Sequence, residues 1–222
     1  MKKILSLIVV LLPWTLKRFL LIKIWKYDIA PSAKIGLAYV FPKYLKMEKG
    51  CKIGHFTVAI HLDLLLMHEN ATISRSNWIT GFPTSSKSKH FEHQNNRKCE
   101  LIIGKESAIT KHHHIDCTNQ IKIGNYTTIA GYYSQFLTHS INIYESRQDS
   151  APISIGDYCF VSTNSVILGG SSLPSYSVLG AKSMLNKTYT DEFSLYGGSP
   201  AKKIKAIPNT AAYFQRQKGF IV

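Results

Sequence analysis

A repeat of six residues runs through the stretch 155–185 and limits what this chain can fold into. Each hexad opens on a branched aliphatic residue, at Ile155, Val161, Ile167, Leu173, Leu179 and Leu185. A small residue follows four positions later, at Cys159, Ser165, Ser171, Ser177 and Ser183. This period matches neither the 3.6 residues of an α-helix nor the alternation of a single strand. A hexapeptide period is typical of a parallel β-helix, so we predict three-sided coils of three hexads with aliphatic side chains stacked inside.

The same spacing starts near residue 28, since Ile35 and Ile53 lie one full coil of 18 residues apart. Residues 81–100 hold no aliphatic side chain, and we predict a polar, basic loop there. A second excursion is predicted over 140–154. The chain then divides into a helix over 1–27, a β-helix domain over 28–207 and a closing C-terminal tail with a short helix over 208–222.

The segment 1–27 differs in kind from the repeat. Its apolar run, Ile4–Leu12, is too short to span a bilayer and lacks the small-residue cleavage site of a signal peptide. Basic residues then alternate with Trp, Phe and Leu, which suits an amphipathic helix lying in the headgroup region of a membrane. A helix that covers the open end of the solenoid would have a similar composition. The two roles are compatible, and both stay open.

The overall charge favours anionic partners. Twenty-seven Lys and Arg residues stand against thirteen Asp and Glu residues, for a net charge of +14. No nucleic-acid-binding motif accompanies this charge, so nucleic acid is not expected as a partner. The four cysteines form no Cys-x-x-Cys pair, which indicates reduced thiols and a cytoplasmic protein without a zinc ribbon.

The repeat breaks between its two halves, and such breaks are where functional residues concentrate. Gln135 stands where an aliphatic residue is due, and His113, Tyr133 and His139 take the small positions of the hexads. His139 directly precedes the second excursion. We therefore take His139 and His113 as candidate functional residues.

The hexads 155–185, followed by Gly198-Ser-Pro-Ala-Lys202, resemble the hexapeptide-repeat acyltransferases, a group that includes galactoside, maltose and xenobiotic acetyltransferases. The resemblance covers about residues 30–207. It implies an all-β solenoid, namely a left-handed parallel β-helix, in a homotrimer that binds acetyl-CoA between neighbouring coils and needs no metal. Thr138-His139 matches the catalytic histidine segment. The N-terminal portion, with Asn77-Trp78-Ile79-Thr80-Gly81, is similar to bacterial members that modify surface polysaccharides.

Acetyl transfer from a thioester to a hydroxyl requires a base that takes the proton of the acceptor. Histidine suits this role at neutral pH, and we assign it to His139. His113 is the second candidate, and Asp116 lies close enough in sequence to orient an imidazole. Three consecutive histidines precede Ile115 without the spacing of a metal site, so no metal is predicted.

Further site residues follow from the resemblance. The pantetheine arm and phosphates of acetyl-CoA would meet Phe160, Ser162, Thr163, Gly180, Ala181, Lys182, Lys187, Pro200, Lys202 and Lys203. Aromatic faces and polar ends suit sugars. On that ground the acceptor pocket would use Trp78, Tyr132, Tyr133, Gln135, Arg147 and Gln148.

Together these features predict an acetyl-CoA-dependent O-acetyltransferase at the inner face of the cell membrane, acting on a bacterial surface glycan or its precursor. Three alternatives stay open at this stage. They are an N-acetyltransferase of a nucleotide-linked amino sugar, a non-catalytic β-helix that binds a partner, and a zinc-dependent hydratase.

Overall fold

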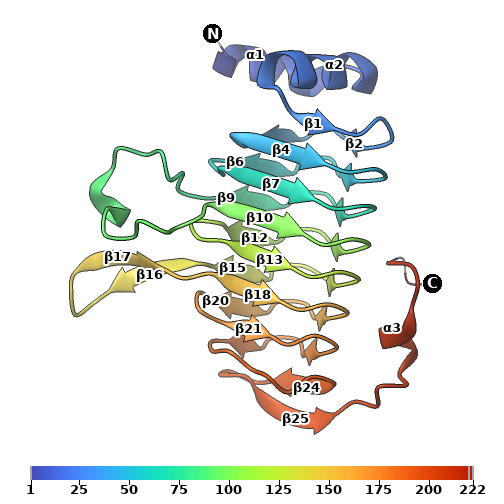
Figure 1. Ribbon diagram of the computed structural model, residues 1–222, viewed down its shortest axis with the longest axis vertical. Coiled ribbons are helices and arrows are strands. Elements are labelled where there is room, and N and C mark those ends of the chain that lie inside the picture. Colours follow the sequence, from blue (N-terminus) through green and yellow to red (C-terminus); the bar gives the residue numbers. More distant parts are fainter. Residues whose placement is uncertain (1, 220, 222) are drawn as a thin grey trace.

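The chain winds into a three-sided column of parallel strands, capped by two helices at its N-terminal end (Figure 1). The structure is a computed structural model and describes residues 2–219 and 221. The three sides of the column are three sheets, which we call A, B and C. Successive strands pass from sheet A to sheet B to sheet C and back to sheet A, so that every coil adds one strand to each sheet. This arrangement confirms the predicted parallel β-helix.

Each sheet is a stack of short strands in coil order. Sheet A contains β1 (Asp28–Ile29), β4 (Tyr44–Met47), β7 (Leu64–Met67), β10 (Glu100–Ile103), β13 (Ile121–Ile123), β18 (Ile153–Ile155) and β21 (Ser172–Leu173). Sheet B contains β2 (Lys34–Ile35), β5 (Lys52–Ile53), β8 (Thr72–Ile73), β11 (Ala108–Ile109), β14 (Thr128–Ile129), β19 (Phe160–Val161), β22 (Val178–Leu179), β24 (Ser194–Gly197) and β25 (Lys202–Ala206). Sheet C contains β3 (Tyr39–Phe41), β6 (Val58–Ile60), β9 (Trp78–Thr80), β12 (His114–Asp116), β15 (Gln135–Leu137), β20 (Val166–Leu168) and β23 (Met184–Leu185).

The core consists of three columns of side chains, one from each sheet. The sheet B column is typical, because the parallel register places its members directly above one another: Ile35, Ile53, Ile73, Ile109, Ile129, Val161, Leu179 and Tyr196. All of them are buried. Each such aliphatic side chain contributes roughly 1.5–3 kcal/mol by leaving water, which is why the hexad pattern is sufficient to specify the column.

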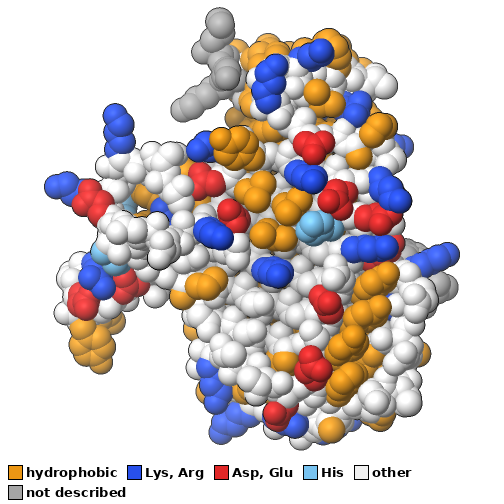
Figure 2. All heavy atoms as spheres, in the orientation of Figure 1, with side chains coloured by type: hydrophobic (Ala, Val, Ile, Leu, Met, Phe, Trp, Pro, Cys, Tyr) orange, Lys and Arg blue, Asp and Glu red, His pale blue; other side chains and the backbone are white. Residues whose placement is uncertain are grey.

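Helices α1 (Lys2–Leu11) and α2 (Trp14–Trp25) cover the first coil. They are two helices rather than the single one expected, because Pro13 cannot continue α1 and instead precedes α2. Lys17 is buried beneath them, and its ammonium lies 2.7 Å from the carbonyl oxygen of Gly36 at the open edge of the column. The helices therefore cap the core. Hydrophobic and basic side chains gather on the outside of this cap (Figure 2).

Two excursions leave the column on the same side (Figure 1). The first is the loop 81–99, which contains the 3₁₀ turn η1 (Lys89–Phe91). The second is an antiparallel hairpin of β16 (His139–Asn142) and β17 (Arg147–Ser150). It is shorter than the excursion expected over 140–154, because Ile153 already pairs with Ile121 in sheet A.

The C-terminal end is closed by β25, which pairs antiparallel with β24. The tail was expected to close this end, but it turns back along the outside of the column, and α3 (Ala212–Gln215) packs there (Figure 1). Phe214 meets the rings of Tyr176 and Phe193 edge-on, at centroid distances of 5.9 and 5.7 Å. Burial of this ring holds the tail against the corner between sheets A and B.

Candidate active site

The break in the repeat is an insertion of one residue before β15. The inward side chains Ile129 and Phe136 lie seven positions apart instead of six, and both are fully buried. The buried small residue before Phe136 is therefore Ser134, and Thr138, two positions after Phe136, is buried as well. The prediction that Tyr133 and His139 fill these positions was wrong by one residue. Tyr133 adopts a φ of 61° in the turn that holds the extra residue, and both side chains point outward.

Asp116 ends β12 and its carboxylate is almost completely buried. Oδ1 accepts hydrogen bonds from the backbone N–H (3.1 Å) and the hydroxyl (2.7 Å) of Thr118. Oδ2 accepts from the backbone N–H groups of Thr138 and His139, at 3.1 and 3.2 Å. These donors fix the carboxylate as an anion, since a buried charge without them would be costly.

The imidazole of His139 lies on the solvent side of this carboxylate. Its Nδ1 is 2.6 Å from Oδ2 of Asp116, and 41% of the side chain is exposed, against 8% for Asp116. With Asp116 ionised, Nδ1 carries the proton of this hydrogen bond and Nε2 is left as the acceptor in the neutral ring. The pair thus presents a fixed basic nitrogen to solvent.

The two pKa values move apart in the direction that keeps the pair charged. The hydrogen bond to Asp116 raises the pKa of His139 above its usual value, although partial burial opposes this. Burial alone would raise the pKa of Asp116, but the hydrogen bonds from His139 and Thr118 overcome that effect and the pKa is lowered. A base whose pKa is raised in this way binds a proton more strongly than a free histidine.

The first excursion supplies one wall around His139. Phe91, buried in η1, meets the His139 ring edge-on at 90°, with 6.1 Å between the ring centroids. The guanidinium of Arg97 stacks on Phe91 at 4.7 Å and donates a hydrogen bond of 2.6 Å to the carbonyl oxygen of Thr118. Arg97 therefore ties the loop to the same turn that holds Asp116.

The hairpin supplies a second wall and is joined to the loop. Nε2 of His93 lies 2.6 Å from Oδ1 of Asp149, and the amide of Gln94 bonds to the backbone and hydroxyl of Ser150. The two excursions, 56 positions apart, thus act as one structure beside His139. Hydrogen bonding to His93 is among the contacts that lower the pKa of Asp149, after that to Asn142.

A pocket of about 340 Å³ opens between the hairpin and the corner that leads from sheet C to sheet A, which we call the C–A corner. His139 and Thr138 form the side of the pocket nearer the N-terminal end of the column. Leu168, Gly169 and Asn186 of the following coils continue the pocket toward the C-terminal end. Gly169 keeps this corner flat, because an added Cβ would lie 2.7 Å from the carbonyl oxygen of Thr138.

His113 does not share this site. It is buried, with Nε2 3.0 Å from the hydroxyl of Thr110 and Nδ1 accepting the backbone N–H of Ser134 at 3.2 Å. Burial lowers its pKa to about 4, so the ring is neutral and holds two coils together. Asp116 orients His139 and not His113. His113 therefore packs between two coils, and the structure does not bring it together with His139.

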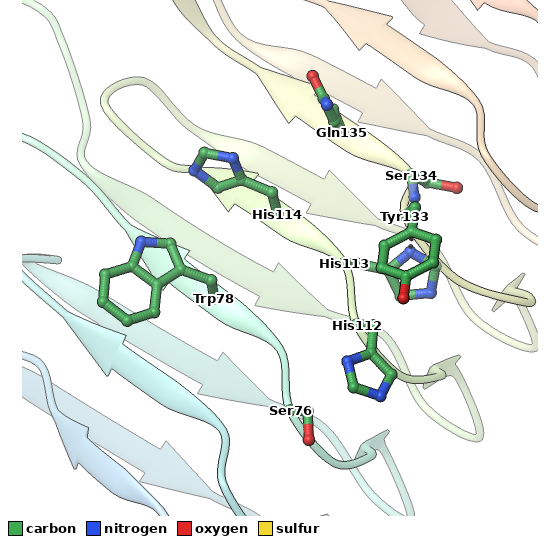
Figure 3. A pocket seen from close by; sticks show the side chains of 8 residues that line it. All are labelled: Ser76, Trp78, His112, His113, His114, Tyr133, Ser134 and Gln135. Atoms are coloured by element: carbon green, nitrogen blue, oxygen red, sulfur yellow. Dashed lines mark hydrogen bonds between the residues drawn. The ribbon is translucent and has the colours of Figure 1, made fainter.

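A second pocket, of about 300 Å³, lies on the outer face of sheet C (Figure 3). Trp78, His114 and Gln135 rise there from the neighbouring strands β9, β12 and β15, at matching positions of the register. Tyr133 closes one side, with its ring 6.0 Å from that of His112. Four of the six expected acceptor residues thus belong to this region: Trp78, Gln135, Tyr133 and the adjoining Tyr132.

The remaining two acceptor candidates are on β17, away from that face. Arg147 pairs with Glu145 at 2.6 Å and with Asp149 at 3.4 Å. Gln148 lines a pocket of about 410 Å³ between the hairpin and the loop, and its buried Oε1 has no hydrogen-bond partner among the described residues. The structure does not bring these two residues together with Trp78.

The residues expected to bind acetyl-CoA are split between two corners of the column. Phe160, Ser162, Thr163, Gly180, Ala181 and Lys182 lie in sheet B and in the corner between sheets B and C, the B–C corner. Lys187 follows Asn186 at the C–A corner, on the side of His139. Pro200 precedes β25, where Lys202 and Lys203 are exposed, with Lys203 paired to Asp191 at 2.9 Å. Within one chain, the width of sheet C separates the B–C corner from His139.

Sequence analysis named Thr138 only as the neighbour of His139, and four other residues of the site were not found. Thr118, Phe91, Arg97 and Gly169 carry contacts that depend on neighbouring coils or on the loop. Among the residues that the structure describes, no cluster of three His, Cys, Asp or Glu side chains is placed to hold a metal.

No protein-family model matches this chain, and no curated protein sequence matches it. Solved structures do match. The polysialic-acid-specific acetyltransferase NeuO is 19% identical, with 81% of this chain and 74% of that chain covered and a TM-score of 0.54. The polysialic acid O-acetyltransferase OatWY is 16% identical, with 81% and 84% covered and a TM-score of 0.55.

A hexapeptide-repeat acetyltransferase of Vibrio cholerae is 27% identical over 49% of this chain, with a TM-score of 0.46. The matched region spans only 63% of that protein's length. A structure of the Vibrio cholerae enzyme with acetyl coenzyme A matches over 61% of its length. NeuO and OatWY are acetyltransferases, and the chain shares their left-handed parallel β-helix fold.

Proposed function

We propose that this protein is an acetyl-CoA-dependent O-acetyltransferase that acts on a bacterial surface glycan or its precursor. One observation carries the proposal: the hydrogen-bonded pair of His139 and Asp116 at the edge of an open pocket, in the β-helix fold of acetyltransferases. Perturbed titratable pairs in clefts are typical of catalytic sites.

The pair suits general-base catalysis. The acceptor hydroxyl donates its proton to Nε2 of His139 as its oxygen attacks the carbonyl carbon of the thioester. The carbon–sulfur bond then breaks, and the imidazolium returns the proton to the departing sulfur. Asp116 holds the ring in the tautomer this requires and stabilises the imidazolium, as the carboxylate does in serine hydrolases. The transfer is direct, without a covalent enzyme intermediate.

The pocket beside His139 fits the thioester end of acetyl-CoA. Its floor is formed by small residues of the C–A corner, among them Gly169 and Ala151, so a narrow chain can lie along the coils. Lys187 lies beyond it, where a cation would meet the phosphates. Phe160 to Thr163 and Gly180 to Lys182 face another side of the same chain.

A homotrimer would bring the two separated sets of expected acetyl-CoA residues, at the B–C corner and at the C–A corner, into one groove. In a ring of subunits with parallel columns, each subunit offers a different patch to its two neighbours. The B–C corner of one subunit then lies opposite the C–A corner of the next, and the acetyl-CoA groove uses both. The outer face of sheet C, with Trp78 and Tyr133, opens into the same cleft and is proposed to bind the acceptor sugar.

We place the protein in the cytoplasm, in peripheral contact with the inner face of the membrane. Two properties support an acceptor saccharide that carries negative charge. They are the net charge of +14 and the exposed basic and aromatic side chains of the pocket on sheet C. The structure contains no helix, within the part it describes, that is long and apolar enough to cross a membrane.

Mass spectrometry tests the proposal. The purified protein is incubated with acetyl-CoA and a panel of cell-surface glycans, and the expected result is a gain of one acetyl group that mild alkali removes. An alkali-stable product would instead identify an N-acetyltransferase. Failure to bind acetyl-CoA in a calorimetric titration would contradict the proposal and favour a non-catalytic binding role.

A further inference from the structure

Helix α1 is apolar on two opposite faces. Val9 is fully buried against the first coil. Ile4, Leu7, Ile8 and Leu11 point the other way and are exposed, Leu11 to 76%. Their spacing of three and four residues places them on one stripe of the helix. A helix that only caps a solenoid needs a single apolar face, so the outer stripe requires another explanation.

Helix α2 adds apolar surface to the same cap. Its Leu16 and Phe19 are exposed, 47% and 54% respectively. We define the cap patch as Ile4, Leu7, Ile8, Leu11, Leu16 and Phe19. All six lie on α1 and α2 at one end of the column (Figure 1), where hydrophobic side chains gather (Figure 2). Exposed apolar patches of this kind mark interaction sites.

The charge around the cap patch indicates what covers it. Residues 1–27 include six Lys or Arg residues and no Asp or Glu. Lys17 is buried, but Lys23 is exposed on α2 and Lys26 is exposed just after its end. A second copy of this cap would bring the same positive charges together and be repelled. The headgroups of anionic lipids complement them, and acyl chains accept the apolar side chains.

The length of the helices decides how the cap meets a bilayer. The ten residues of α1 extend for about 15 Å, half the thickness of a hydrocarbon core. Both helices lie across the end of the column (Figure 1). We propose that the cap patch docks on the surface of a membrane containing anionic lipids, so that the column stands upright on it. Three parallel subunits would present three such caps in one plane.

Docking in this way fixes the height of the active site, meaning the distance of His139 from the lipid surface. The assignment of His139 to the active site rests on the proposed function. His139 follows β15, four strands along sheet C from β3 in the first coil. Four strand spacings correspond to about 19 Å, and the helical layer adds about 10 Å. His139 then stands roughly 30 Å above the lipid surface. The acceptor must be a glycan long enough to reach it, so sugars next to the lipid anchor are excluded as substrates.

Vesicle flotation tests the docking. Wild-type protein is mixed with vesicles of phosphatidylcholine, with or without phosphatidylglycerol, and compared with Leu7→Ser/Leu11→Ser/Phe19→Ser. The wild type is expected to float with the anionic vesicles, and the triple variant to lose at least tenfold in bound fraction. Ile204→Ser, at the opposite end of the column and similarly exposed, is the matched control and keeps wild-type binding.

Three results would overturn the docking proposal: wild-type protein that stays with neither kind of vesicle, a triple variant that binds as the wild type does, or a triple variant whose oligomeric state differs in lipid-free solution. The last would show that the cap patch joins copies of this chain. Circular dichroism confirms folding of each variant, and the exposed positions of the substitutions make retained folding the expectation.

A labelled thiol tests the height. The four native cysteines are buried, so Leu11→Cys and Tyr144→Cys each provide a single exposed thiol for a fluorophore. Spin-labelled lipids should quench the label at residue 11 and leave the label at 144 unaffected; quenching of both would contradict the upright column. On vesicles, long lipid-linked glycans should be acetylated and short ones should not. If soluble glycans are acetylated but vesicle-bound ones show no length dependence, the height inference fails and the proposed function stands.

Discussion

Nδ1 of His139 lies 2.6 Å from Oδ2 of Asp116, although the two residues are 23 positions apart. They meet because β12 and β15 are neighbours in sheet C and place Asp116 beside Leu137 in the register. The insertion before β15 keeps Phe136 inside, and the side chain of His139, three positions later, points outward over the carboxylate. The coil geometry thus holds the pair.

The substitution Asp116→Asn tests what the carboxylate does. Its hydrogen bond raises the pKa of His139, so removing the charge should lower that pKa. The neutral base is the active form, so kcat/KM should begin to rise at a lower pH than in the wild type. The maximum should fall on the order of 10²-fold as orientation is lost.

The measurement is a pH–rate profile, with thermal unfolding as the control for folding. Some loss of stability is expected, because the amide of Asn faces backbone N–H donors that the carboxylate satisfied, at a cost of about 1–3 kcal/mol. A slower enzyme whose profile keeps its acidic limb in place would show that Asp116 does not tune His139.

Mixed trimers test whether two subunits build one site. His139→Ala and Gly180→Trp, each inactive alone, are co-expressed with different tags and purified through both. If His139 and the B–C corner come from neighbouring subunits, every trimer that carries both tags has one intact site out of three, so activity should return to about a third of the wild-type level. Mixed trimers with no more activity than the separate variants would place both residues in one chain's site.

The sequence predicted the column well, because the hexads place an aliphatic residue inside at each turn and no other arrangement buries them. It also found His139, from its position before the second excursion, and Asp116, from its closeness to His113 in the sequence. It could not pair them, because the partner of Asp116 depends on which strands stack. His113, drawn from the same run of histidines, turned inward, where the hydroxyl of Thr110 binds it.

The walls of the site lay beyond the reach of a repeat pattern. Phe91 belongs to a loop without periodicity, and its position over His139 depends on Arg97 reaching back to the turn at Thr118. The split of the expected acetyl-CoA residues between two corners has a similar origin. Positions that adjoin in a linear motif can lie on different faces of a three-sided coil.

Gly169→Ala tests the floor of the pocket. An added Cβ would lie 2.7 Å from the carbonyl oxygen of Thr138 and 3.1 Å from that of Ala151, so the corner beside His139 must shift. We expect a loss of about 1–3 kcal/mol in the free energy of unfolding and a higher KM for acetyl-CoA. Gly180→Ala is the stability control, since its Cβ would meet nothing closer than 3.4 Å and unfolding should be unchanged. A Gly169→Ala variant with the same free energy of unfolding as the wild type would show that the corner tolerates a methyl group.

Lys17 gives the cap a dependence on alkaline pH. Burial lowers its pKa from 10.5 to about 8. Between these values the unfolded chain holds a proton that the folded protein has released, so the free energy of unfolding rises with pH. Relative to Lys17→Met, the wild type should gain roughly 1.4 kcal/mol per unit of pKa difference across this window. Chemical denaturation at several pH values measures it, and a difference that stays constant from pH 8 to 10 would contradict a neutral, buried Lys17.

The turnover of His139→Ala tests the central claim most directly. With a glycan that the wild type acetylates and saturating acetyl-CoA, the variant should lose on the order of 10²–10⁴-fold in kcat, because the acceptor hydroxyl has lost its base. Its melting temperature should change little, since the side chain is 41% exposed. A variant that acetylates the glycan at the wild-type rate would contradict the assignment of His139 as the general base.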